Sequence, residues 1–223
     1  MIPRTLEPEV MDLPDDAREY DSMDHREVNQ AFTKDFLDKR DPEDGFLVLD
    51  VGTGTAQIPI VICQHDPRFI IHALDLAKSM LDIANQNIQA TSFQNQIITI
   101  LQDAKKLSFP ENHFDAVISN SIIHHIPDPA LVFSEMVRVT KPGGLLFVRD
   151  LMRPPIEPAV ARLVKLHAAQ ATAYQQKLFG DSLRAALTEQ EVRNMVGELG
   201  FGKETVRQSS DRHWTWIARK RIP

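Results

Sequence analysis

From residue 46 onward, short apolar runs alternate with segments long enough to form helices. The runs are rich in Val, Ile, Leu and Phe and show little polar alternation, as expected for strands covered on both faces of a parallel sheet. They lie at 46–51, 69–74, 97–101, 114–119 and 145–149, and the helix-sized segments lie at 55–65, 77–90 and 129–140. This repeat predicts an α/β fold built on a doubly wound, Rossmann-like sheet.

The residues before this repeat have a different character. Residues 1–44 show helical periodicity, with Tyr20, Val28 and Phe36 on one face. Asp21 and His25 are one helical turn apart, so both could point into a pocket. We therefore expect a helical N-terminal arm over 1–44 that acts as a lid, followed by the main domain over 45–223.

The residues after the repeat predict further helices and a final pair of strands. The chain breaks at Pro154 and Pro155, and an Ala- and Gln-rich stretch then predicts a long helix over roughly 157–178. A capping box at Thr188 opens another helix. We expect the segment 151–187 to cover a substrate, with His167, Tyr174 and Phe179 in its wall. Residues 204–208 and 214–218 predict an antiparallel pair, with Trp214 and Trp216 packed in the core.

Charge is distributed unevenly along the chain. The arm holds 14 acidic and 6 basic side chains, whereas the other residues hold 17 acidic and 19 basic ones. Nucleic-acid affinity comes mainly from Lys and Arg, so this balance predicts no nucleic-acid partner. The arm could be a solvated helix face, or an acidic lip that favours a cationic ligand.

Cysteine content and apolar run lengths exclude several other classes. Cys63 is the only cysteine, which rules out an intramolecular disulfide and a cysteine-based zinc site within one chain. The apolar runs are too short for a bilayer span, and residues 1–4 do not resemble a signal peptide. We expect a cytoplasmic protein without membrane insertion and without a metal site.

A glycine turn follows the first apolar run, in the segment Leu47–Ala56. Gly52 and Gly54 allow the backbone to approach a ligand closely, and the next helix presents free N–H groups to it. A dinucleotide site would favour a third glycine at position 57, where this chain has Gln57. Asp50, just before the turn, suits a positively charged ligand better than a diphosphate. The turn could also be purely structural.

Two acidic residues follow the next strands of the repeat. Asp75 ends the second strand, 21 residues after Gly54, where it could accept hydrogen bonds from two ribose hydroxyls or cap the following helix. Asp103 follows the third strand and could accept from an adenine amino group or cap a turn. Behind the glycine turn, ribose is the favoured interpretation of Asp75.

Four blocks at 49–56, 72–81, 114–120 and 141–145 together carry a resemblance to a known family. In their order and spacing the chain resembles a class I S-adenosylmethionine-dependent methyltransferase. The family often has a third glycine where this chain has Ala56. Within the family, residues 123–129, 183–188 and 17–21 are most similar to small-molecule methyltransferases of ubiquinone and menaquinone biosynthesis.

The resemblance implies a seven-stranded sheet whose last strand runs antiparallel, with S-adenosyl-L-methionine as cofactor. It places the two glycines at the methionine part, Asp75 at the ribose, and Asp103 with Ala104 at the adenine. The whole expected cofactor site comprises Tyr20, Asp50, Gly52, Thr53, Gly54, Asp75, Leu76, Met80, Asp103, Ala104 and Asn120. The resemblance also implies a small-molecule substrate.

Methyl transfer from a sulfonium needs alignment and exclusion of water more than it needs a base. A base helps only where the nucleophile carries a proton. His125 is the first candidate, with His124 and Asp150 behind it, because all three follow the fourth and fifth strands. Two alternatives stay open: a protein that binds S-adenosylmethionine without transferring methyl, and a nicotinamide-dependent oxidoreductase.

Overall fold

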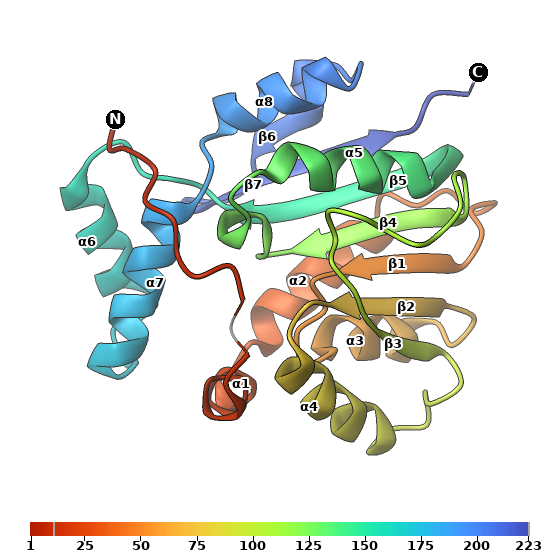
Figure 1. Ribbon diagram of the computed structural model, residues 1–223, viewed down its shortest axis with the longest axis horizontal. Helices are drawn as coiled ribbons and strands as arrows, with labels where there is room; N and C mark the ends of the chain where they lie inside the picture. The colour runs from red at the N-terminus through yellow and green to blue at the C-terminus, as the bar shows by residue number, and fades with distance from the viewer. Residues whose placement is uncertain (11, 223) are drawn as a thin grey trace.

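The computed structural model describes residues 1–10 and 12–222. Seven strands form one sheet in the order β3-β2-β1-β4-β5-β7-β6 (Figure 1). They are β1 (Leu47–Val51), β2 (Ile70–Asp75), β3 (Ile97–Leu101), β4 (Phe114–Asn120), β5 (Thr140–Leu151), β6 (Val206–Gln208) and β7 (His213–Arg219). The first five strands pair in parallel, and β7 pairs antiparallel with both β5 and β6. The predicted doubly wound sheet with an antiparallel last strand is confirmed.

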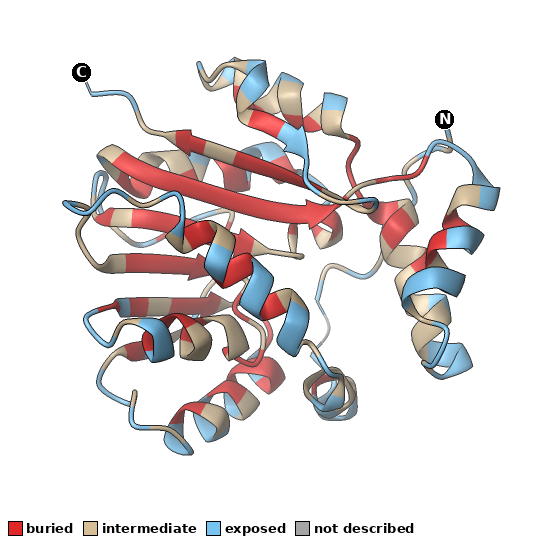
Figure 2. Ribbon diagram, turned by 180° about the vertical axis from the view of Figure 1, so that it is seen from behind, coloured by how far each residue is buried: buried red, intermediate tan, exposed pale blue. Residues whose placement is uncertain are grey.

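Helices cover both faces of the sheet (Figures 1 and 2). They are α1 (Pro14–Ser22), α2 (Arg26–Leu37), α3 (Gln57–His65), α4 (Lys78–Gln89), α5 (Pro129–Val139), α6 (Glu157–His167), α7 (Ala173–Ala185) and α8 (Glu189–Glu198). Two short 3-10 helices, η1 (Ile123–His125) and η2 (Lys203–Thr205), complete the described part. No helix among the described residues is long and apolar enough to cross a bilayer.

Each face of the sheet has its own apolar core. On one face, side chains of α2, α3 and α4 pack on β1, β2 and β5, with Phe32 and Phe36 of α2 fully buried. On the other face, α5 and α8 pack on β4 and β7, where Trp214 and Trp216 are fully buried as expected. The second half of the predicted N-terminal arm therefore belongs to the core of the sheet.

The predicted helical periodicity of the arm is interrupted in the structure. The chain leaves the helix at Met23, which has an extended backbone, and a new helix begins after His25. Asp21 and His25 consequently do not share one helix, and the expectation that helical spacing aims both into a pocket is wrong. Asp21 instead accepts hydrogen bonds from Gln57 (3.1 Å) and Asn87 (2.9 Å).

The single helix predicted over 157–178 is also wrong. The structure contains α6 and α7 with a turn between them, and Thr172 caps the second helix through a capping box with Gln175. The hydroxyl of Thr172 accepts a hydrogen bond from the Gln175 backbone N–H. This bond gives a partner to an N–H group in the first turn of α7 and so favours the start of a new helix at this point. The capping box predicted at Thr188 is confirmed at the start of α8.

Candidate functional site

One pocket opens at the carboxyl ends of β1, β2 and β4, the edge toward which their arrowheads point in Figure 1. The space between its walls, counted together with the open mouth, is about 840 Å³. It is lined by Glu9, Val10, Tyr20, Gly52, Gly54, Leu74, Asp75, Leu76, Ala77, Met80, Gln102, Asp103, Ala104, Lys105, Asn120, Ser121, Ile122, His125 and Ile126. Ten of the predicted site residues therefore lie together. Asp50 and Thr53 line a smaller cavity that shares Tyr20, Gly52 and Asn120 with the pocket.

The glycine turn between β1 and α3 forms the floor of the pocket. Gly52 (φ +77°) and Gly54 (φ +56°) both have left-handed backbone. A Cβ on Gly52 would lie 2.1 Å from Ile122, whereas one on Gly54 would lie 3.6 Å from Tyr20. The turn is held by the carbonyl of Leu74, which accepts from Gly52 and Thr53 at 2.8 Å each. A strand that ends in this turn provides a close, side-chain-free approach to a ligand.

Ala56 occupies the position where related proteins often have a third glycine, and it also has left-handed backbone (φ 61°). Its methyl group is fully buried among core side chains under α3. An alanine in this conformation costs about 1–2 kcal/mol. The departure from the family pattern therefore bears on the helix start, not on the pocket, which Ala56 does not line.

Asp75 faces the pocket from the end of β2. Its two carboxylate oxygens accept from the backbone N–H groups of Gly54 (2.8 Å) and Ala77 (2.9 Å). Each oxygen keeps a lone pair for a further donor. Burial raises the pKa of Asp75 in spite of these bonds. The residue does not cap α4, because that helix begins at Lys78 and the Ser79 N–H donates to Asp12 of the arm at 2.8 Å.

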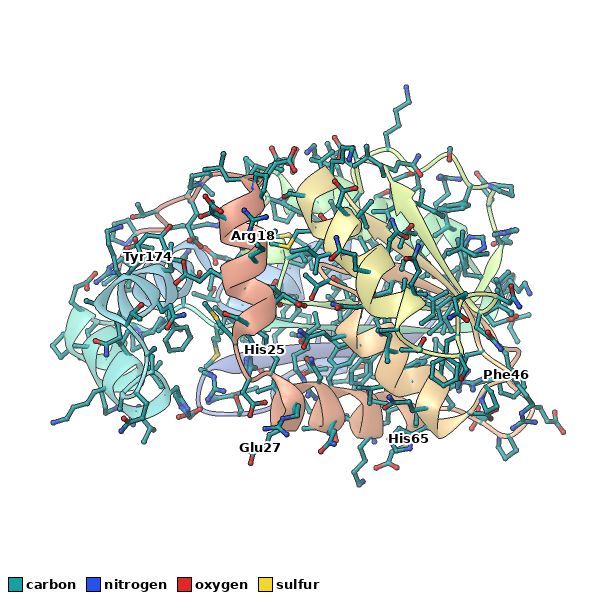
Figure 3. The ribbon with its side chains drawn as sticks, turned by 90° about the horizontal axis from the view of Figure 1, so that it is seen from below. Arg18, His25, Glu27, Phe46, His65 and Tyr174 are labelled. Carbon is teal, nitrogen blue, oxygen red and sulfur yellow. The ribbon has the colours of Figure 1, made fainter. Side chains whose placement is uncertain are left out.

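Helix α1 lies across the pocket. Its single fully buried residue, Ala17, packs with Ala77 and Met80 in a small apolar cluster. Tyr20 reaches the glycine turn, and burial, together with the charge of Asp75, raises the pKa of its hydroxyl to about 12. Figures 1 and 3 both place α1 between α4 and α7, with Tyr174 on the opposite side of α1 from α4.

Four polar side chains near the turn are candidates for holding a charged ligand. Asn120 Oδ1 is buried without a hydrogen-bond partner and faces both cavities, so a donor from a ligand would satisfy it. Asp50 is 2% exposed, and burial raises its pKa to about 7. The hydroxyls of Thr53 and Thr55 are also buried without partners in the second cavity.

Asp103 and Ala104 lie at the far end of the pocket, after β3. Asp103 accepts from the backbone N–H of Lys105 at 2.8 Å, so it also shapes its own turn. The ammonium group of Lys105 pairs with Glu9 of the arm and with Asp103 at 3.3 Å. Glu9 and Lys105 were not predicted from the sequence, because no local pattern joins residues so far apart.

The two histidines of η1 have different surroundings. His124 is 4% exposed, and its Nδ1 lies 2.6 Å from Asp150 Oδ1. Burial alone would lower the pKa of His124, but the charge and hydrogen bond of Asp150 outweigh it and raise that pKa. Burial would likewise raise the pKa of Asp150, but the neighbouring imidazole lowers it. Asp150 also accepts from the Ile123 and His124 backbones, so it holds η1 in place.

His125 lines the pocket, whereas His124 and Asp150 line neither cavity. Burial, followed by the charge of His124, lowers the pKa of His125 to about 4. Its Nδ1 is buried without a partner. Of the residues expected in the substrate wall, His167 pairs instead with Asp211 at 2.7 Å and Tyr174 is half exposed.

The N-terminal strap, which we define as residues 2–9, was not predicted as part of the site. Arg4 holds it in place through donors to the carbonyl groups of Ala185 (2.7 Å), His124 (3.2 Å) and Ile126 (2.9 Å). The strap brings Glu7 to His124 Nε2 at 3.9 Å. Burial raises the pKa of Glu7.

Comparison with known proteins agrees with this geometry. Residues 49–148 match the sequence profile of a methyltransferase domain. Residues 49–148 are therefore a methyltransferase domain, and the sheet order and the pocket agree with the resemblance of the sequence to class I S-adenosylmethionine-dependent methyltransferases.

Within that class, the chain is similar to enzymes of quinone biosynthesis. It is 32% identical over 124 residues to the demethylmenaquinone methyltransferase of Geobacillus stearothermophilus, covering 55% of this chain and 53% of that protein. It is 23% identical over 191 residues to the ubiquinone/menaquinone biosynthesis C-methyltransferase of Vibrio cholerae, covering 80% and 72%. The chain thus spans about half the length of the first of these relatives.

The fold is shared with solved structures over nearly the whole chain. A proposed S-adenosylmethionine-dependent methyltransferase from Methanococcus maripaludis superposes with a TM-score of 0.73 at 17% identity, covering 98% of both chains. This likeness concerns the fold, and it extends to the N-terminal and C-terminal helices outside residues 49–148.

Proposed function

We propose that this protein transfers the methyl group of S-adenosylmethionine to a small molecule by direct displacement. The observation that carries the proposal is the pocket at the strand ends, where the glycine turn, Asp75 and the unpartnered Asn120 meet within a methyltransferase domain. In the transfer, the bond between sulfur and the methyl carbon breaks as the bond from the nucleophile forms, and the positive charge on sulfur is lost.

We assign the parts of the cofactor along the pocket from the residues that face each part. The methionine part would lie on Gly52 and Gly54, where Asn120 Oδ1 offers an acceptor to its ammonium group. The ribose hydroxyls would donate to the free lone pairs of Asp75. The adenine would lie between Met80 on one side and Asp103 and Ala104 on the other. Leu76 and Tyr20 would cover the adenine and the sulfonium. Asp50 and Thr53 support the turn from the second cavity.

The role that we propose for the protein in the reaction is alignment and exclusion of water. Helix α1 and the strap cover the pocket and would keep a bound substrate in line with the methyl group. For a nucleophile that carries a proton, His125 is the residue in the pocket able to accept it, while Asp150 and His124 position the loop that carries His125. A histidine whose pKa is lowered to about 4 is a weak base near neutrality, so its contribution falls at the low end of the usual range of about 10²–10⁴-fold.

The similar proteins suggest which substrates to test first. The relatives above are named as methyltransferases of menaquinone and ubiquinone biosynthesis. We therefore propose a hydroxylated aromatic ring as the first substrate class, and the apolar lining contributed by Ile122 and Ile126 near His125 is compatible with it.

Cofactor binding and methyl transfer can be tested separately. S-adenosylhomocysteine should bind the protein in calorimetric titration, and Asp75→Ala should weaken it by about 1–3 kcal/mol through loss of hydrogen bonds to a charged acceptor. Asp82→Asn on the exposed side of α4 is the matched control and should change nothing, because Asp82 pairs only with Lys78. Equal affinity in a folded Asp75→Ala variant would remove the site assignment.

Incubation of the protein with methyl-labelled cofactor and a fractionated metabolite extract then tests the transfer itself. We expect label in a hydroxylated aromatic fraction. Binding of the cofactor with no labelled product from any fraction would instead support the alternative of a cofactor-binding protein that does not transfer methyl.

A further inference from the structure

A cluster of potential metal ligands lies at the side of the pocket. Among the described residues, Glu7, His124 and His125 each offer a ligand atom, and these atoms all lie within 4.8 Å of one another. Glu7 comes from the strap and the histidines from η1, so the cluster joins segments more than a hundred residues apart in the chain. We propose that these three side chains bind a divalent transition-metal ion such as Zn²⁺.

Two polar atoms of the cluster have no hydrogen-bond partner among the described residues. They are Glu7 Oε1 and His125 Nδ1, both of which are buried, and the Glu7 side chain is only 10% exposed. A buried polar atom without a partner destabilises the fold, so two of them within 4.8 Å of each other call for a common partner. The 3.9 Å between His124 Nε2 and Glu7 Oε1 is too long for a hydrogen bond. It is spanned readily by two metal–ligand bonds of about 2.0–2.2 Å each.

Asp150 orients one of the ligands. It accepts from His124 Nδ1 at 2.6 Å, which leaves the lone pair on Nε2, the atom that faces Glu7. A carboxylate that holds the far nitrogen of a histidine is the usual outer partner of a metal-binding imidazole. Asp150 is therefore a positioning residue in this arrangement. It is 1% exposed and is not one of the three side chains whose ligand atoms cluster.

The charges around the cluster favour a cation. Glu7 and Asp150 contribute two carboxylates, and Arg4 is an opposing charge that acts on His124. The Arg4 guanidinium is bound to carbonyl oxygens, including those of Ala185 and Ile126, and so serves to hold the strap. Two imidazoles with one carboxylate suit Zn²⁺, Co²⁺ or Ni²⁺ better than Mg²⁺ or Ca²⁺, which prefer all-oxygen sites.

The position of the cluster gives the ion access and a chemical use. His125 lines the pocket, so an ion can enter from there and keep open coordination positions toward a substrate. A bound ion lowers the pKa of a coordinated hydroxyl and would thereby activate a nucleophile that carries a proton. This use rests on the proposed methyl transfer, whereas binding of the ion does not.

The test measures ion binding to the tag-free, chelator-treated full chain without cofactor. Zn²⁺ and Co²⁺ should each bind at about one ion per chain, with Co²⁺ giving the visible absorption of a site with nitrogen ligands, and Mg²⁺ should not compete. Glu7→Gln and His125→Ala should each weaken Zn²⁺ by at least about 10–100-fold, and Asp150→Asn by a similar factor through His124. Thermal unfolding establishes that each variant is folded.

Two matched controls separate this site from nonspecific binding. Glu27→Gln changes an exposed carboxylate in the first turn of α2, and His65→Ala removes an exposed histidine at the end of α3 (Figure 3). Both should bind Zn²⁺ as the unchanged chain does. The rival arrangement is a metal-free chain of charges in which a protonated His124 lies between Asp150 and Glu7. Absence of saturable binding would overturn the metal site and leave that arrangement, and equal binding in folded Glu7→Gln and His125→Ala would overturn the assignment of these ligands.

Discussion

Asp50 is the buried carboxylate whose ionisation should most affect the stability of the ligand-free protein. Burial, with the charge of Asp75, raises its pKa to about 7 from a usual value near 3.8. Between these two values the folded state holds a proton that the unfolded state has released, so stability falls as the pH rises through this window and is constant above it.

Asp50→Asn should remove this loss of stability. The variant should match the unchanged protein near pH 4 and exceed it above pH 7, by roughly 2–4 kcal/mol for a shift of about three pKa units. Thermal unfolding across this range, with Asp82→Asn as the surface control, measures the difference. A constant offset between variant and unchanged protein at every pH would contradict the expected ionisation of Asp50.

At the same scale, the sequence predicts residues that act within a local pattern. Gly52, Gly54 and Asp75 follow strands directly, so their place at the strand ends can be inferred from a few neighbouring residues. Glu7 and Glu9 have no such signal. Glu7 comes near His124 and Glu9 lines the pocket because the strap crosses the strand ends, and that path depends on the contacts of Arg4 with η1 and α7.

Among the α-helices of the described residues, α1 has the fewest buried side chains. Ala17 alone is fully buried, whereas α2 inserts Phe32 and Phe36 into the core. The other contacts of α1 and its flanking residues are polar. Asp12 accepts a hydrogen bond from the Ser79 N–H of α4, and Asp21 accepts one from the side chain of Gln57. An element with few buried apolar contacts opens locally at low free-energy cost.

We therefore expect the cofactor to stabilise α1 selectively. Hydrogen exchange with and without S-adenosylhomocysteine should show slower exchange over 14–22 in the complex, because Tyr20 contacts the glycine turn on which the methionine part is proposed to lie. Helix α2 is the internal control and should exchange equally slowly in both states. Equal protection of α1 with and without ligand would indicate a permanently docked helix.

Helix boundaries mark the limit of what periodicity could predict at this scale. An apolar face at i, i+4 spacing indicates helix on both sides of Met23 and says little about a break between them. The break occurs because α1 packs on α4 while α2 packs on α3 and the sheet, and one straight helix could not meet both surfaces. The turn before Thr172 did have a local signal, which is the capping box of Thr172 with Gln175. The prediction of one helix over 157–178 did not take this signal into account.

For the whole molecule, the topology was the most predictable property. Five apolar runs separated by helices are compatible with few sheet topologies. Crossovers between parallel strands are right-handed, and strands that follow each other in the sequence usually lie close together in the sheet. The order of the strands and the antiparallel β7 agree with the family resemblance. The way the acidic arm lies on the body was not predictable, because it depends on single ion pairs between distant residues.

These ion pairs link the two oppositely charged parts of the chain. Glu9 pairs with Lys105, Asp35 with Arg149 at 2.6 Å, and Asp44 with Arg219 at 2.8 Å. Each pair is at least partly exposed, and such pairs contribute about 0.2–1 kcal/mol and are screened by salt. The arm should therefore loosen as ionic strength rises, most of all at α1, where apolar packing is least.

Limited trypsin digestion can detect this loosening at Arg18, which lies on the exposed side of α1 (Figure 3). From about 0.1 M to 1 M salt the screening length falls from about 10 Å to 3 Å, so cleavage should accelerate by roughly 2–10-fold, as expected for losing one or two exposed pairs. Trypsin activity on a small peptide at the same salt corrects for effects on the protease. Lys105→Met should raise cleavage at low salt and flatten the salt dependence, because the pair with Glu9 is already absent. Apolar contacts are not weakened by added salt, so unchanged or slower cleavage would show that packing of Ala17 and Tyr20, and not charge, holds the arm on the body.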